Sequence, residues 1–261
     1  MSNAELNYLS VAKNILHNGI KQSGRNGVTK RLPFQTLDFN ISEYFPLLTS
    51  RKIFYKSALG EYAAFIRQPK HIDRFKFFNC NYWDAWSNLD GDINIDYGNK
   101  WINWKGINQY EQVLTELKKN PTSRRLLISG WDPSNLHNLD LPCCHYSYQF
   151  WSDGTNLNLL WNQRSSYWMI GMPFDMVLAS IMLLSFASLS NLKPQNIKMV
   201  IADAHIYEEH FANATKQLQA KLFDLPRYKF KPQSSLYTFW PKHLEIVNYK
   251  YTNNIKYLLK E

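Results

Sequence analysis

The feature that most limits the possible folds is a long apolar stretch from Met176 to Leu189, broken only by serines. It falls short of the roughly 20 residues that a membrane-spanning helix needs. A helix that is apolar all round is stable in water only when protein surrounds it. The stretch therefore predicts a buried helix around which the rest of the chain packs.

Periodic segments on both sides of this stretch predict an α+β chain. Helical patterns cover residues 5–21, 56–67 and 107–119, and extended patterns cover 32–41, 126–131, 145–151, 156–161 and 197–202. Asp153 and Gly154 lie between two extended segments and favour a hairpin. No linker or repeat is visible, so we expect a single domain, 1–261, with one sheet and one long buried helix.

The charge and the cysteines limit the partners and the compartment. The net charge of +9 is spread along the chain without a basic run, and it suits a nucleotide phosphate, a polyglutamate or a nucleic acid alike. The three cysteines, Cys80, Cys143 and Cys144, have no metal-site spacing, so no metal is expected. Their odd number and the lack of a signal peptide favour a reducing cytoplasm, that of the host if a phage encodes the chain.

Candidate chemistry begins at Cys143 and Cys144, which precede His145 at the start of an extended segment. A lone cysteine there is usually a small buried hydrophobe. A positive neighbour such as Arg164 would favour the thiolate, the reactive form. The adjacent Ser165 adds a hydroxyl that can help hold a phosphate.

Three further motifs supply polar groups. Residues 123–125 place two arginines before a strand, and residues 203–207 end another strand with an alternating polar face. Residues 171–175 are interpreted as a loop leading into the buried helix, where Asp175 could simply cap that helix. Together with Cys144, these motifs offer a nucleophile, anion-binding groups and neutral hydrogen-bonding groups.

The order of these motifs resembles the thymidylate synthase family from about residue 18 to 232. The matching segments are FPLLTSRK (45–52), YWDAW (82–86), DYGNKW (96–101), SRRLLISGW (123–131), LPCCHYSYQF (141–150), NQRS (162–165), GMPFD (171–175) and DAHIY (203–207), together with Arg25 and Glu61. The resemblance implies the family's single-domain α+β fold, with a mixed sheet and a long buried helix. It also implies a homodimer formed through the sheet face, with active sites shared between subunits.

The resemblance also implies a role for individual residues. The implied catalytic residues are Cys144 as nucleophile, with Glu61, His145, Tyr97 and Asp203. The implied nucleotide-binding residues are Arg25, Gln163, Arg164, Ser165, Gly171, Asp175, His205 and Tyr207, with Arg124 and Arg125 reaching across from the second subunit. The implied folate-binding residues are Trp83, Trp86, Tyr167, Gly171 and Phe174. The implied cofactor is 5,10-methylenetetrahydrofolate, and the implied substrate is a pyrimidine nucleoside monophosphate.

Three departures from the family pattern bear on the substrate and the product. Asp175 stands where enzymes that use dUMP usually carry Asn, and it resembles the deoxycytidylate hydroxymethylases, found in phages that modify their DNA. A carboxyl group accepts from the N4 amino group of cytosine, whereas two acceptors would meet at O4 of uracil. Tyr167 replaces an Asp that helps bind the pterin, and residues 257–261 lack the apolar ending that shields the methylating enzymes from water. We therefore expect hydroxymethylation of dCMP.

Other activities remain compatible with the sequence. A C5 methyltransferase acting on dUMP or dCMP shares the same motifs, as does a relative that methylates or hydroxymethylates CMP. A non-catalytic nucleic-acid-binding relative would fit the charge and the aromatic residues. Retention of Cys144, Glu61 and the phosphate-binding arginines argues against that last reading.

Overall fold

The computed structural model describes residues 4–24, 26–252 and 255–258. Within this part, seven strands form a mixed sheet in the order β1-β2-β7-β5-β4-β3, and β6 pairs with β7. Strands β5 and β6 run parallel to β7, and the other pairs are antiparallel. The bounds are β1 Ile20–Gly24, β2 Gly27–Asn40, β3 Leu127–Ser129, β4 His145–Ser152, β5 Asn156–Gln163, β6 Ser166–Tyr167 and β7 Lys193–Tyr207.

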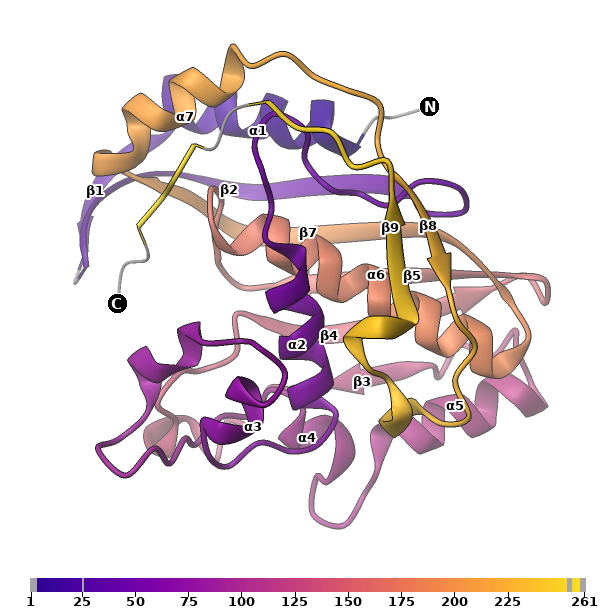
Figure 1. Cartoon of the computed structure of the whole chain (residues 1–261). Coiled ribbons are helices and arrows are strands. Elements are labelled where there is room, and N and C mark those ends of the chain that lie inside the picture. Colours follow the sequence, from indigo (N-terminus) through magenta and orange to yellow (C-terminus); the bar gives the residue numbers. More distant parts are fainter. Residues whose placement is uncertain (1–3, 25, 253–254, 259–261) are drawn as a thin grey trace.

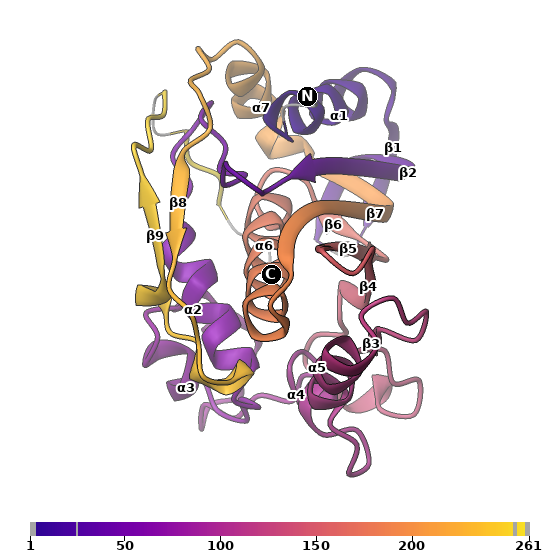
Figure 2. The same ribbon diagram turned by 90° about the vertical axis from the view of Figure 1, so that its right-hand side faces the viewer.

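The long apolar helix is α6, Gly171–Ser190, and it packs against one face of this sheet (Figure 2). Its buried position is as predicted, because α2 and α5 cover the sides that the sheet leaves free. The prediction that this helix is too short to span a membrane was wrong. Residues 171–175 begin the helix rather than forming a loop before it, so the helix has 20 residues. By length and composition it would suit a membrane span, but 78% of its apolar window is buried in the protein.

Most of the remaining helices lie at the two ends of the sheet (Figure 1). Helices α1 and α7 pack together beside β2, and α4 lies beside β3 at the other end, while α2 packs on the side of α6 that faces away from the sheet (Figure 2). A two-stranded sheet of β8 and β9 forms from the C-terminal part of the chain. The bounds are α1 Ala4–Asn18, α2 Tyr55–Phe65, α3 Asp73–Lys76, α4 Asn99–Ile102, α5 Gln109–Lys119, α7 Phe211–Leu218, β8 Arg227–Phe230 and β9 Leu244–Val247, with the short 3-10 helices η1 Tyr82–Trp86, η2 Leu136–Asn138, η3 Glu208–His210, η4 Leu236–Thr238 and η5 Pro241–His243.

The α+β class, the mixed sheet and the hairpin at residues 152–155 are confirmed. Strands β1 and β2 pair as an antiparallel hairpin that the sequence did not predict. Every residue of β1 is exposed, so this strand carries no alternating apolar pattern that could reveal it. Strand β7 is longer than predicted, and β3 is shorter.

Candidate active site

Two adjacent cysteines stand just before β4, and their surroundings differ. Cys143 is 1% exposed, and burial raises the pKa of its thiol well above the ordinary value. Cys144 is only partly buried. Of the two, Cys144 is therefore the thiol that a ligand can reach, in agreement with the nucleophile that the family resemblance implies.

Arg164 and Tyr97 surround Cys144. The Arg164 backbone N–H donates to the carbonyl of Cys144, and its Nε and Nη2 donate to the carbonyls of Cys143 and Pro142, each at 2.9 Å. These bonds fix the guanidinium beside the thiol. The Tyr97 hydroxyl accepts from the backbone N–H of Cys144, so its own proton is free to point at the sulfur.

The balance of these effects on Cys144 differs from the sequence-based expectation. Burial raises the pKa of the Cys144 thiol, while Arg164 and Tyr97 act in the opposite direction. The predicted influence of the arginine is therefore present, but burial outweighs it. A bound anion at Arg164 would add to this bias toward the thiol, so the proton of Cys144 needs an acceptor before the sulfur can attack.

His145 is a neutral, enclosed residue. It is 3% exposed, and its ring lies 4.6 Å from the Tyr97 ring and 4.5 Å from the Trp161 ring, centroid to centroid. Burial lowers the pKa of His145 to about 3. Its Nδ1 lies 2.6 Å from the Tyr148 hydroxyl, and its Nε2 lies 3.9 Å from Oδ1 of Asp175. The contact with Asp175 is therefore not an ion pair at neutral pH.

A chain of hydrogen bonds orients Asp175 on α6. The Trp161 indole donates to Oε1 of Gln163 at 3.0 Å, and Nε2 of Gln163 donates to Oδ2 of Asp175 at 2.7 Å. Because an indole N–H can only donate, it fixes which end of the Gln163 amide faces Asp175. Burial raises the pKa of Asp175 well above its ordinary value; Gln163 opposes the shift and Glu61 adds to it. Asp175 therefore keeps its proton to a higher pH than an exposed aspartate does.

Glu61 on α2 is the second buried acid near this position. It is 7% exposed, and its Oε1 accepts from the Trp83 indole at 2.8 Å. Burial raises the pKa of Glu61 to about 7, against the opposing effects of Tyr82 and Trp83. A carboxyl that gains and loses a proton near neutrality is suited to general acid–base catalysis.

The polar end of β7 carries Asp203 and two of the implied nucleotide-binding residues, His205 and Tyr207. Asp203 forms an ion pair with Arg31 on β2, and its Oδ1 lies 3.2 Å from Nδ1 of His205. Burial, assisted by Arg31, lowers the pKa of His205 to about 4. These contacts place Asp203 in a β2–β7 cluster, whereas the resemblance implies that it belongs with Glu61 and Tyr97 among the catalytic residues.

Tyr167, the residue that replaces the expected Asp, belongs to the same end of β7. Its ring stacks between His205, at 5.9 Å, and His210, at 5.6 Å, and meets Tyr207 edge-on at 4.8 Å. The Tyr167 phenol therefore fills space beside His205 and Tyr207. It supplies no carboxylate to a pterin.

An aromatic wall adjoins Glu61. Trp83 and Trp86 have ring centroids 5.3 Å apart, and Phe174 meets Tyr82 edge-on at 5.7 Å. Trp83 is 3% exposed, so Trp86 and Phe174 present more surface to a ligand. Flat aromatic groups of this kind fit a pterin ring, so the residues present fit a folate. Gly171 opens α6 here, and a side chain built on it would meet Oδ2 of Asp175 at 3.8 Å.

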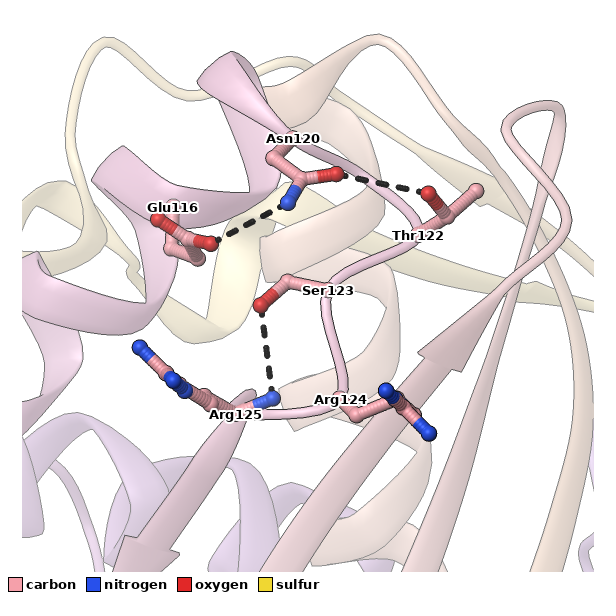
Figure 3. A pocket seen from close by; sticks show the side chains of 6 residues that line it. All are labelled: Glu116, Asn120, Thr122, Ser123, Arg124 and Arg125. Atoms are coloured by element: carbon pink, nitrogen blue, oxygen red, sulfur yellow. Dashed lines mark hydrogen bonds between the residues drawn. The ribbon is translucent and has the colours of Figure 1, made fainter.

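Two of the remaining phosphate-binding candidates, Arg124 and Arg125, do not lie at Cys144. Arg124 and Arg125 are exposed and line a surface cavity of about 270 Å³ with Glu116, Asn120, Thr122 and Ser123 (Figure 3). Leu127 pairs with Gln149, so the arginine pair lies beside the far end of β4 from Cys144. Ser165 follows Arg164 and is partly buried, while Arg25 lies outside the described residues.

Sequence reasoning did not single out four residues that organise this site: Arg31, Tyr82, Tyr148 and Trp161. Tyr82, Tyr148 and Trp161 lie within or next to the quoted motifs, but aromatic residues are common in cores and carry no distinctive signal. Arg31 faces Asp203 only because β2 pairs with β7, a contact between residues distant in sequence.

A partly exposed thiol, a neutral histidine and two acids of raised pKa on one α+β scaffold are groups that covalent catalysis uses. The family model for thymidylate synthase matches residues 6–260, and the chain belongs to the thymidylate synthase family. It is accordingly a one-carbon transferase acting at C5 of a pyrimidine nucleotide. The family's one-carbon donor is methylenetetrahydrofolate.

Proposed function

We propose that this enzyme transfers a hydroxymethyl group to C5 of dCMP, giving 5-hydroxymethyl-dCMP. The observation that carries the proposal is the state of Asp175, a buried carboxyl with a raised pKa and a fixed orientation. Its Oδ2 accepts a hydrogen bond from Gln163, so Oδ1 is the oxygen that can face the base, either with a proton or without one.

Cytosine and uracil present different hydrogen-bonding groups to Asp175. Cytosine offers an N4 amino donor and a basic N3, so it pairs with a protonated carboxyl or, after N3 takes up the proton, with a carboxylate. Uracil offers an O4 acceptor and an N3–H donor, so it pairs only while the carboxyl keeps its proton. Cytosine therefore suits Asp175 in both protonation states, and uracil in one.

Covalent activation falls to Cys144. The thiolate adds to C6 of the pyrimidine, and the electrons of the C5–C6 double bond move onto C5 and the ring. Asp175 supports the ring charge at N3. Methylenetetrahydrofolate would supply the one-carbon unit that bonds to C5. C5 then releases its proton, water adds to the new carbon as tetrahydrofolate departs, and loss of the Cys144 thiolate from C6 restores the ring double bond. Glu61, with its pKa of about 7, moves protons to and from the reacting groups, including the water that becomes the hydroxyl.

The phosphate site requires a second protomer in this proposal. Arg164 lies at Cys144, but Arg124 and Arg125 lie at the other end of β4 and cannot reach the same nucleotide within one chain. The sheet face opposite α6 exposes Trp151 to 61% and Leu127 to 49%. Burying that face against a second copy would cover the apolar side chains and bring the arginine pair to the partner's Cys144.

Product identification tests the proposal directly. The purified protein is incubated with methylenetetrahydrofolate and, separately, with dCMP, dUMP and CMP, and the products are identified by mass. Formation of 5-hydroxymethyl-dCMP as the fastest reaction is expected. Preferential formation of thymidylate from dUMP would overturn the substrate assignment. Formation of 5-methyl-dCMP would show that the enzyme transfers a methyl group rather than a hydroxymethyl group.

A further inference from the structure

Tyr82 brings an additional hydroxyl to Glu61. It opens the short helix η1, next to Trp83, and its ring packs edge-on against Phe174. The hydroxyl oxygen is buried and faces two groups, the Glu61 carboxyl and the Cys80 thiol. It interacts with both but has a well-aligned hydrogen bond to neither. A buried hydroxyl beside a titrating acid calls for an explanation.

The two neighbours of Glu61 differ in what they can offer. The Trp83 indole can only donate, so it holds one carboxyl oxygen, at 2.8 Å, and favours the charged form. A phenol hydroxyl donates to a carboxylate and accepts from a carboxylic acid by rotating about one bond. Cys80 is a poor competitor because a thiol is a weak partner in either direction.

We propose that Tyr82 is a positioning residue for Glu61: its hydroxyl donates to the carboxylate and accepts from the acid. The carboxyl thereby keeps its place while its proton enters and leaves. This inference rests on the proposed function, in which Glu61 moves protons. Through its contact with Phe174, the same tyrosine ties the position of Glu61 to the aromatic wall of the folate site.

The groups around Glu61 determine the direction in which its pKa should shift when the Tyr82 hydroxyl is removed. The groups that face it are Tyr82, Trp83, Cys80 and Asp175. Burial raises the pKa of Glu61 to about 7, and Tyr82 and Trp83 hold it down by donating to the charged form. Because a hydrogen bond to the charged carboxylate is stronger than one to the neutral acid, removal of the Tyr82 hydroxyl raises the pKa of Glu61 further.

The decisive variant is Tyr82→Phe, which keeps the ring against Phe174 and deletes only the hydroxyl. Titration of a carbon-13-labelled Glu61 carboxyl by NMR is expected to shift upward by about one pH unit, and the matching limb of the pH–rate profile should move with it. Tyr228→Phe is the matched control, because that hydroxyl donates to the Ile41 carbonyl outside the site, at 2.6 Å. An unshifted titration in Tyr82→Phe overturns the role of Tyr82.

A second variant is expected to shift the pKa of Glu61 in the opposite direction, which a misfolded protein would not do. Incorporation of 3-fluorotyrosine at position 82 makes the hydroxyl a stronger donor, so the Glu61 titration is expected to move downward. A shift in the upward direction would contradict the proposal. The NMR titration needs no turnover: an inactive unsubstituted enzyme overturns the proposed function, whereas an unshifted titration overturns the role of Tyr82. The two failures are therefore distinguishable.

Discussion

At the residue scale, this site depends on burial to set protonation states. Asp175 and Glu61 both have raised pKa values, and His145 and His205 both have lowered ones. In each case burial is the largest cause, because a low-dielectric surrounding penalises the charged form. Burial thus reduces the charge that these four side chains carry near neutral pH.

Cys144→Ser is expected to abolish turnover while nucleotide binding survives, because the hydroxyl is far less nucleophilic than the thiolate. Cys143→Ser should retain most of the activity, since the Cys143 side chain is buried away from the ligand. Steady-state kinetics and a direct nucleotide-binding titration separate the two effects. Active Cys144→Ser with inactive Cys143→Ser would show that the nucleophile has been misassigned.

Asp175→Asn is expected to move preference from dCMP toward dUMP. Gln163 donates to Oδ2, so the amide carbonyl of the new side chain should occupy that position and its NH₂ should replace Oδ1. That donor suits O4 of uracil. One mismatched buried pair is worth roughly 1–3 kcal/mol, which corresponds to a swing of about tenfold to a hundredfold in the ratio of kcat/KM values. An unchanged ratio would mean that Asp175 does not read the base.

Glu61→Gln is expected to remove activity and yet to raise stability at pH 8. The pKa of Glu61 rises from 4.5 to about 7 on folding, so its contribution to stability is present below pH 4.5 and is lost as the pH rises toward 7. The neutral amide escapes this loss and can still accept from Trp83. The gain at pH 8 is at most roughly 3 kcal/mol. Urea unfolding at pH 5 and pH 8 measures it; an equal effect at both values would contradict the shifted pKa.

At the element scale, a single turn positions Tyr97 against Cys144. Gly98 follows Tyr97 with φ at +69°, and a Cβ there would lie 2.0 Å from the Phe65 carbonyl oxygen at the end of α2. The Tyr97 and Phe65 rings stack at 5.2 Å. The close approach of these two segments thus places the hydroxyl that contacts the thiol.

Gly98→Ala is expected to destabilise the protein by about 2 kcal/mol or more and to lower kcat, because backbone must shift to relieve the clash. Gly106→Ala is the matched control: its φ is +85°, but no atom lies within 4 Å of a built Cβ. It should cost only about 1 kcal/mol, from backbone strain, and leave kcat intact. Equal losses in urea unfolding and kcat for both variants would show that the contact with α2 has no special role.

The sequence predicted much of the fold because the apolar pattern is local: it is periodic in the amphipathic α5 and continuous in the buried α6. It predicted poorly where pairing across the chain decides the structure, as in the wholly exposed β1. For the site, motif order pointed to Cys144, Asp175 and Glu61. The protonation state of these groups depends on burial by distant segments, so no local pattern could reveal it.

At the scale of the whole molecule, the single domain spanning residues 1–261 and the dimer both remain predictions. One mixed sheet and one buried helix dominate the described residues, in agreement with the family fold. The dimer stays a proposal, supported by the exposed sheet face and by the position of Arg124 and Arg125.

Mixing two inactive variants tests the shared site. A protein carrying both Arg124→Ala and Arg125→Ala is combined with Cys144→Ala, and the subunits are allowed to exchange. Some mixed dimers then contain one site with both the thiol and the arginine pair, so about a quarter of full activity or less should return. A fully active monomer at micromolar concentration, established by sedimentation, would contradict the arrangement.

The hydrogen-bond chain from Trp161 through Gln163 to Asp175 has an evolutionary consequence. Aspartate and asparagine codons differ by one nucleotide, and Gln163 would hold either side chain in the same orientation. The surrounding fold needs no second change to accept the exchange. If Asp175 reads the base as proposed, a cytosine enzyme and a uracil enzyme built on this scaffold are one point mutation apart, and selection on a single base of the gene can choose between them.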